Sequence, residues 1–229
     1  MDTDFSQYLR PTFFLDFDNS EVATFAESLC SSNMTVTEKA ITLYYAVRDQ
    51  IKYNPYDLRY SQTAMKASDV LKKQSGYCVA KAVLLAAVGR QQGIPCRLGF
   101  ADVTNHLSTA RLRDMMGTDL FVYHGYTEMY LNDAWVKATP AFNLSLCSKF
   151  GVVPLEFDGI QDSIFHAHDV HGHKHMEYVR DHGHFADLPF ELIFAAYGSA
   201  YPRFFEHYGS GQTHDFATEA EQEAGNSSE

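Results

Sequence analysis

The sequence predicts an α+β protein whose helical N-terminal half packs on an antiparallel β-sheet. Before residue 93, apolar residues recur at the spacing of amphipathic helices or form one continuous run typical of a buried helix. After residue 95, the pattern changes to alternation, with a turn signal between two alternating segments. Helices followed by strands, rather than interleaved with them, are typical of the α+β class.

Four helices are predicted in the N-terminal half. Thr35 and Glu38 match the capping box, in which the two residues exchange side-chain-to-backbone hydrogen bonds at a helix start. Asn54-Pro55 ends the helix that follows, because proline has no N–H to donate. The predicted helices span residues 19–30, 36–52 and 67–73, and the fourth begins at Cys78.

The fourth helix carries the most informative residue, Cys78. It follows a predicted glycine turn over residues 74–76 and precedes an apolar run over residues 82–88. A thiol at a helix N-terminus faces unpaired N–H groups and the positive end of the helix dipole, and both favour the thiolate. We therefore expect Cys78 to have a lowered pKa and to react with alkylating reagents well below pH 8.

Three strands follow, at residues 96–103, 121–131 and 134–141. Asn132-Asp133 between the last two strands is a two-residue hairpin turn. A register that starts from this turn places Glu128 opposite Lys137, a favourable cross-strand charge pair that supports the register. The loop between the first two strands contains a short predicted helix over residues 109–116, and we expect it to cover a site.

The same register extends to His124 on the middle strand. His124 lies opposite Ala141 and has Thr139 as its diagonal neighbour on the same face, which Asn143 shares if the strand continues. A cysteine at a helix start and a histidine on a strand are the two parts of a cysteine nucleophile site. The sequence therefore predicts that Cys78 and His124 meet in space.

The order and spacing of several short motifs over about residues 36–143 carry a family resemblance. These motifs are Ala67 to Leu71, Gly76, Cys78, Ala82, Gly93-Ile94-Pro95-Cys96-Arg97, His124, Glu128, Trp135-Val136 and Pro140. Together they resemble the transglutaminase-like superfamily, cysteine enzymes with a papain-like catalytic core. The remainder of the chain, notably residues 150–200, resembles bacterial members of the group. The resemblance implies a papain-like core that carries Cys78 and His124 as the catalytic pair.

Two positions depart from the family's pattern. Val79 stands where the family usually has tryptophan, and Thr139 stands where it has a catalytic aspartate. A threonine oxygen can accept the imidazole N–H, but it has no charge to stabilise an imidazolium. Losing that charge in a comparable triad lowers turnover by up to about four orders of magnitude. The resemblance thus implies a Cys78–His124–Thr139 triad, with Asn143 as the alternative residue that orients the imidazole.

The chemistry implied by the resemblance is acyl transfer from a peptide or amide substrate through a thioester, completed by water or by an amine. The Cys78 backbone N–H supplies one oxyanion donor, and Gln74 or Tyr77 supplies a second. No organic cofactor is implied. A function of another class stays open, because the missing aspartate also fits a non-catalytic relative that uses the fold as a binding module.

Seven histidines between residues 166 and 184 are the second feature of the sequence. Alternate members would share one strand face, namely His166 with His168, and His171 with His173 and His175. Such spacing can build a metal site, with Asp162, Asp169, Glu177 and Asp181 as nearby oxygen ligands. A metal-binding protein is therefore a third alternative, although the segment contains no HExxH motif.

Charge and composition limit which binding partners and which cellular location we expect for the protein. The 229 residues have a net charge of −11, and their 18 basic residues form no patch, so nucleic acid and anionic membranes are not expected partners. The first residues lack the basic and apolar regions of a signal peptide. No apolar run approaches the roughly 20 residues that span a bilayer. We expect a cytoplasmic protein, and its oligomeric state stays open.

The chain shows no internal repeat and no sharp boundary within its first 208 residues. We therefore expect one domain over residues 1–208, with a core over about 36–143 and a C-terminal extension over 144–208. Residues 209–229 are polar and acidic, and we expect them to form a disordered tail.

Overall fold

The computed structural model describes residues 4–58, 60–105, 108–164, 176–206 and 215–226. Its α-helices are α1 (Ser20–Leu29), α2 (Val36–Gln50), α3 (Ala67–Lys73), α4 (Cys78–Gln91), α5 (Ala110–Met116), α6 (Leu144–Phe150), α7 (Phe190–Ala200), α8 (Pro202–Glu206) and α9 (Phe216–Asn226). Its strands are β1 (Lys52–Tyr53), β2 (Ser75–Gly76), β3 (Cys96–Asn105), β4 (Leu120–Leu131), β5 (Ala134–Ala138) and β6 (Met176–Phe185). Short 3₁₀ helices lie at Ser6–Tyr8, Pro55–Asp57 and Thr63–Met65.

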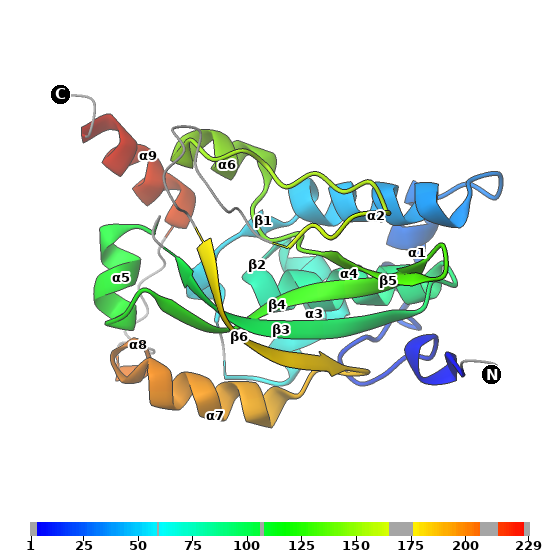
Figure 1. Ribbon diagram of the computed structural model, residues 1–229, viewed down its shortest axis with the longest axis horizontal. Coiled ribbons are helices and arrows are strands. Elements are labelled where there is room, and N and C mark those ends of the chain that lie inside the picture. Colours follow the sequence, from blue (N-terminus) through cyan, green and yellow to red (C-terminus); the bar gives the residue numbers. More distant parts are fainter. Residues whose placement is uncertain (1–3, 59, 106–107, 165–175, 207–214, 227–229) are drawn as a thin grey trace.

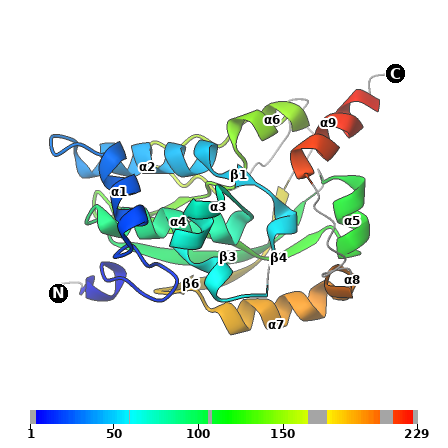
Figure 2. The ribbon, with the colours of Figure 1, turned by 180° about the vertical axis from the view of Figure 1, so that it is seen from behind.

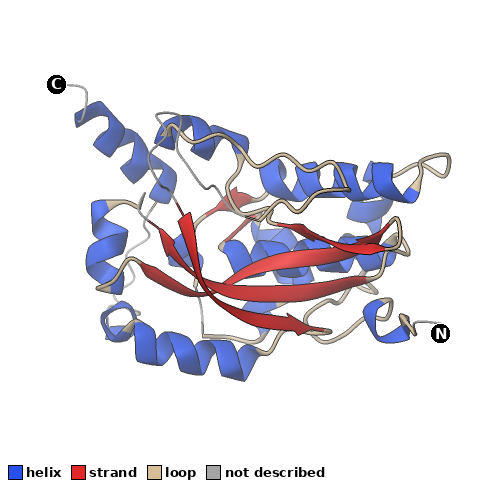
Figure 3. Cartoon of the chain, in the orientation of Figure 1, coloured by secondary structure: helices blue, strands red, loops and turns tan. Residues whose placement is uncertain are grey.

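The elements form a sheet with a layer of helices behind it (Figures 1 and 3). The sheet has the strand order β5-β4-β3-β6, and all its neighbours are antiparallel. The view from behind shows α3 and α4 in front of the strands and α2 running above them (Figure 2). Of these helices, α4 packs directly on β4 and β3. The predicted α+β class is confirmed.

Helix α4 is the centre of the molecule. Every residue from Cys78 to Arg90 is buried, so the helix has neighbours on all sides rather than along one apolar stripe. Lys81 is fully buried, and its Nζ donates to the carbonyls of Arg48 (2.9 Å) and Ile51 (2.6 Å) at the C-terminal end of α2. These bonds satisfy carbonyls that a helix end leaves open, and they fix α2 against α4. The capping box predicted for α2 is confirmed.

The hairpin has the predicted register near its turn. Asn132 and Asp133 both have positive φ, as this turn requires, and Glu128 lies opposite Lys137. However, Glu128 forms its ion pair with Arg97 of β3, its other cross-strand neighbour.

The pairing of the hairpin ends earlier than expected. Strand β5 stops at Ala138, and the Thr139 N–H donates to the Ser163 carbonyl (2.8 Å) instead of to β4. Pro140, which has no N–H, follows directly. His124 therefore has Ala101 of β3 as its register partner, and the expected pairing of His124 with Ala141 was wrong.

The C-terminal segment is more ordered than its composition suggested. The sequence predicted disorder over residues 209–229, but in the described part of this segment Phe216–Asn226 form α9. Phe216 is 2% exposed, and its ring packs against Tyr53 and Phe150. Phe216 therefore holds α9 against the rest of the protein. The average composition of the segment is polar and acidic, so it does not reveal this single buried contact.

Candidate active site

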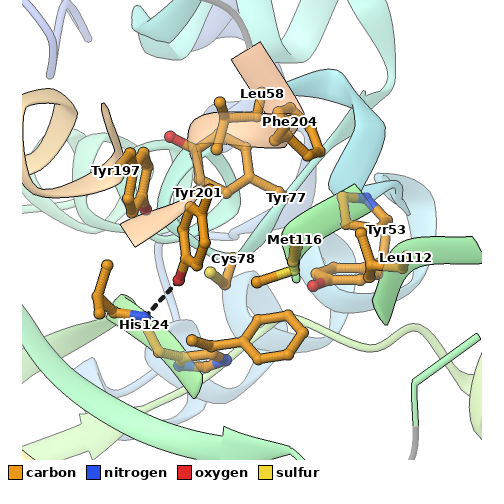
Figure 4. Close-up of a pocket in the computed structure, with 13 residues that line it drawn as sticks. Tyr53, Leu58, Tyr77, Cys78, Leu112, Met116, His124, Tyr197, Tyr201 and Phe204 are labelled. Carbon is orange, nitrogen blue, oxygen red and sulfur yellow. Dashed lines mark hydrogen bonds between the residues drawn. The ribbon is translucent and has the colours of Figure 1, made fainter. Parts of the chain in front are cut away.

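Cys78 and His124 line the same pocket (Figure 4). The pocket is narrow, with a cavity volume of about 40 Å³, or about 450 Å³ when the open solvent at its mouth is counted. Its walls come from the N-terminal half, from α5 and β4, and from α7 and the segment that follows it. The lining residues are Tyr53, Pro55, Leu58, Tyr77, Cys78, Leu112, Met116, Phe121, Val122, His124, Tyr197, Tyr201 and Phe204. Because this lining contains no Asp, Glu, Lys or Arg, the pocket is apolar and aromatic.

Cys78 is the first residue of α4, as predicted. The chain reverses at Gln74, which has a left-handed φ of 57° and ends α3, and not at Gly76. Gly76 is needed for packing, because a Cβ at this position would lie 2.9 Å from the Cβ of Ala80. The chain thus reverses within the predicted turn over residues 74–76, but at Gln74, and the glycine instead permits a close approach to α4.

The expected lowering of the Cys78 pKa was wrong. Burial raises the pKa of the Cys78 thiol to about 11, although the N–H groups of Gly125, Val79 and Cys78 itself favour the thiolate. The side chain is only 6% exposed, and loss of hydration outweighs the hydrogen bonds. At neutral pH, Cys78 is a thiol.

His124 is also neutral. Its side chain is 5% exposed, and burial lowers the pKa of the imidazole to about 4. The two residues that share the pocket lining therefore rest as a thiol and a neutral imidazole, and not as a thiolate and an imidazolium. An ion pair is unfavourable here because both charges would lose hydration in an apolar pocket.

Gly125 allows β4 to pass close to the start of α4. A Cβ on Gly125 would lie 2.9 Å from the Cα of Val79 and 3.0 Å from its Cγ2. A distance below 3.0 Å to a backbone atom cannot be relieved by a side-chain rotation. The glycine after His124 therefore sets how near the histidine strand comes to the cysteine helix.

A β-bulge in β4 precedes His124. Val122 and Tyr123 lie opposite the single residue Asp102, and Tyr123 has a φ of 52°. The Tyr123 N–H donates to Asp102 Oδ1 (2.9 Å), and the Val122 N–H donates to Tyr201 Oη (2.6 Å, the dashed line in Figure 4). Side chains from β3 and the C-terminal part thus satisfy the backbone groups of the bulge.

Asp102 has a second partner, His182 of β6. His182 Nε2 lies 2.7 Å from Asp102 Oδ1, and the imidazole stacks on the Tyr123 ring with centroids 3.9 Å apart. This buried cluster fixes the strand segment that ends at His124. Neither Asp102 nor Tyr201 could be predicted as part of the site, because no local pattern in the sequence links them to β4.

Thr139 and Asn143 are engaged elsewhere. Thr139 Oγ1 donates to the Ile164 carbonyl (2.8 Å). Asn143 Oδ1 accepts from the Tyr53 N–H (3.1 Å), and its Nδ2 donates to Ser145 Oγ (2.7 Å). Within the described residues, His124 has no hydrogen bond to either side chain.

Of the two candidates for the second oxyanion donor, Gln74 and Tyr77, only Tyr77 lines the pocket. The Gln74 amide donates to the Leu71 carbonyl (2.6 Å), and Gln74 is not among the lining residues. Tyr77 lines the pocket, but its hydroxyl contacts Met65 Sδ at 3.6 Å. The predicted helix over 109–116 does cover the site, since Leu112 and Met116 of α5 form part of the wall.

The predicted metal ligands His166, His168, His171, His173 and His175 lie outside the described residues. Among the residues that are described, no cluster of three or more His, Cys, Asp or Glu could hold a metal ion. No described helix combines the length and the apolar character needed to cross a membrane.

Of the comparisons with known proteins, the match to a family profile supports the resemblance seen in the sequence. The chain aligns over 80% of its length with a crystal structure from Cytophaga hutchinsonii that is described as a candidate cysteine protease, at 18% identity and a TM-score of 0.48. It spans 55% of that chain. Comparison with curated proteins gives no match. A profile of the transglutaminase-like superfamily matches residues 23–140, slightly more than half of the sequence. The chain belongs to the transglutaminase-like superfamily.

Proposed function

We propose that the chain is a cysteine-nucleophile enzyme that transfers an uncharged, apolar acyl group from a peptide or amide to water or to an amine. The observation that carries this proposal is the meeting of Cys78 and His124 in one pocket whose lining has no carboxylate, ammonium or guanidinium group. A charged substrate group in this pocket would lose its hydration without gaining a counter-charge.

The neutral resting pair suits a coupled first step. Cys78 Sγ bonds to the carbonyl carbon while its proton passes to His124, and the carbonyl π electrons move to oxygen. Collapse of this intermediate expels the amine, which takes the proton from His124, and leaves a thioester on Cys78. Water or an acceptor amine, deprotonated by His124, then attacks the thioester and releases the thiol.

Hydrolysis of fluorogenic peptide amides tests the proposal. We expect substrates with leucine or phenylalanine at the cleaved bond to exceed those with glutamate or lysine at least tenfold in kcat/KM, because the apolar pocket excludes charge. Cys78→Ala should abolish turnover, and His124→Asn should lower it at least a hundredfold. Cys147→Ala is the matched control, since this buried cysteine does not line the pocket. Turnover that survives Cys78→Ala would refute the proposal.

The rate of Cys78 alkylation distinguishes this resting state from an ion pair. Since burial raises the thiol pKa to about 11, the rate should climb steadily from pH 7 to pH 10. A plateau below pH 8 would indicate a thiolate held by an imidazolium.

A second function has its own support. The hydroxyl of Thr139, at the family's aspartate position, donates to a backbone carbonyl, and the Cys78–His124 pair is uncharged. These features favour a binding module for apolar ligands. Such a module would bind the same peptides, measured by calorimetry, without forming a thioester detectable by mass spectrometry.

A further inference from the structure

Tyr53 places a hydroxyl in the pocket that has no partner among the described residues. The residue lines the pocket and is only 7% exposed. The other tyrosine hydroxyls of the pocket are occupied: Tyr201 binds the Val122 N–H and the Leu120 carbonyl, and Tyr77 contacts Met65 and Tyr197. The Tyr53 oxygen is not one of the fully buried polar atoms of the described residues, so it opens onto the pocket and is available to a bound group.

The fold brings Tyr53 close to the nucleophile. Strand β1 pairs in parallel with β2, and this register sets Tyr53 opposite Gly76, two residues before Cys78. Figure 4 shows the Tyr53 hydroxyl pointing into the pocket that Cys78 lines. The phenol and the Cys78 sulfur therefore face the same pocket space.

Tyr53 is also held firmly. Its N–H donates to Asn143 Oδ1 (3.1 Å), and its ring packs against Phe142 and Phe216 with centroid distances of 4.8 Å and 5.8 Å. Contacts from two separate parts of the chain, residues 142–143 and Phe216, leave the ring little freedom to turn away. A fixed donor in an apolar pocket is the arrangement that stabilises developing negative charge.

We propose that the Tyr53 hydroxyl is the second oxyanion donor of this active site. The inference rests on the proposed function and adds a catalytic residue to it. When Cys78 Sγ bonds to the carbonyl carbon, the carbonyl oxygen gains the electron pair and accepts hydrogen bonds from the Cys78 N–H and from Tyr53. Tyr53 keeps its proton throughout. The same hydroxyl acts again when the acceptor attacks the thioester.

The test is Tyr53→Phe, which removes one oxygen atom and keeps the ring. Loss of one oxyanion donor lowers kcat by about 10²- to 10³-fold in other enzymes. We expect a fall of that order in kcat for peptide amides with KM changed less than threefold. The thermal midpoint should stay the same or rise, because no hydrogen bond is lost. Tyr130→Phe is the matched control, since Tyr130 lies at the opposite end of β4 and does not line the pocket.

Three readouts keep this inference separate from the proposed function. Cys78→Ala must abolish turnover; if it does not, the proposed function fails, and this inference fails with it. If Cys78→Ala is inactive but Tyr53→Phe keeps its kcat, only the role of Tyr53 is refuted. If Tyr53→Phe slows Cys78 alkylation as strongly as it slows turnover, the hydroxyl binds the sulfur and not the carbonyl oxygen, which also refutes the role.

Discussion

At the scale of single residues, hydration decides the charge state of the proposed catalytic pair, Cys78 and His124. The helix start provides N–H groups that favour the Cys78 thiolate, and a cysteine in water would respond to them. In this pocket the lost hydration is the larger effect, so both Cys78 and His124 rest uncharged. The same loss of hydration raises the pKa of the Tyr53 phenol well above its usual value, so this hydroxyl keeps its proton.

The shifted pKa of His124 predicts an acid-dependent loss of stability. Between pH 6.5 and about 4, an unfolded imidazole binds a proton and the native ring does not. The free energy of unfolding should therefore fall as the pH falls through this window, by about 3 kcal/mol from this group. Urea unfolding of the wild type and of His124→Asn at pH 7 and pH 4.5 measures this loss in the free energy of unfolding. Equal losses in both proteins would contradict the prediction.

At the scale of elements, the site depends on how close β4 comes to α4. Gly125 lets the strand backbone approach the first turn of the helix, and the bulge at Val122 and Tyr123 adjusts the strand just before His124. Asp102 and Tyr201 supply the hydrogen bonds that the bulge removes from the sheet. The relative placement of Cys78 and His124 therefore depends on the contact between β4 and α4, and not on an unusual feature within either element.

Gly125→Ala tests this junction. The added methyl group would meet the Val79 backbone at 2.9 Å, so β4 and α4 must separate. We expect turnover to fall at least a hundredfold, because small misplacements of reacting groups cost that much. Destabilisation by about 1–3 kcal/mol should accompany the loss.

The control for this substitution is Gly198→Ala on α7. No atom lies within 4 Å of the Cβ it would add. We expect this helix substitution to stabilise the protein by about 0.5–1 kcal/mol and to leave turnover unchanged. Wild-type turnover in Gly125→Ala would show that the close approach is not required.

At the scale of the whole molecule, the C-terminal part completes the site. Tyr197, Tyr201 and Phe204 form one wall of the pocket, and Phe216 of α9 packs on the ring of Tyr53. Helix α9 also binds the start of α5, where Glu223 accepts from the Ala110 N–H (2.7 Å). Residues beyond the superfamily match at 23–140 are therefore part of the pocket's construction.

Phe216→Ala tests the contribution of α9. Truncation of a buried phenylalanine typically costs about 3–5 kcal/mol, and we expect a loss of that size in the free energy of unfolding. Gln222→Ala, at an exposed position of the same helix, should change it by less than about 0.5 kcal/mol. A disordered C-terminal segment would leave both variants as stable as the wild type. Chemical denaturation distinguishes these outcomes.

Much of the fold could be predicted from local patterns. The capping box at Thr35, the start of α4 at Cys78 and the register around Asn132-Asp133 depend on residues a few positions apart, so the sequence displays them directly. Strand β6 and helix α9 were missed because neighbours remote in the chain stabilise them.

By itself the sequence determined the family, the candidate nucleophile and the candidate base, since each depends on residue type and spacing. Only the tertiary structure decided the charge state of that pair, the apolar lining of the pocket and the unpartnered Tyr53 hydroxyl. The physical reason is that hydration and hydrogen-bond satisfaction depend on every group packed around an atom. In this protein those groups come from segments between residues 53 and 204.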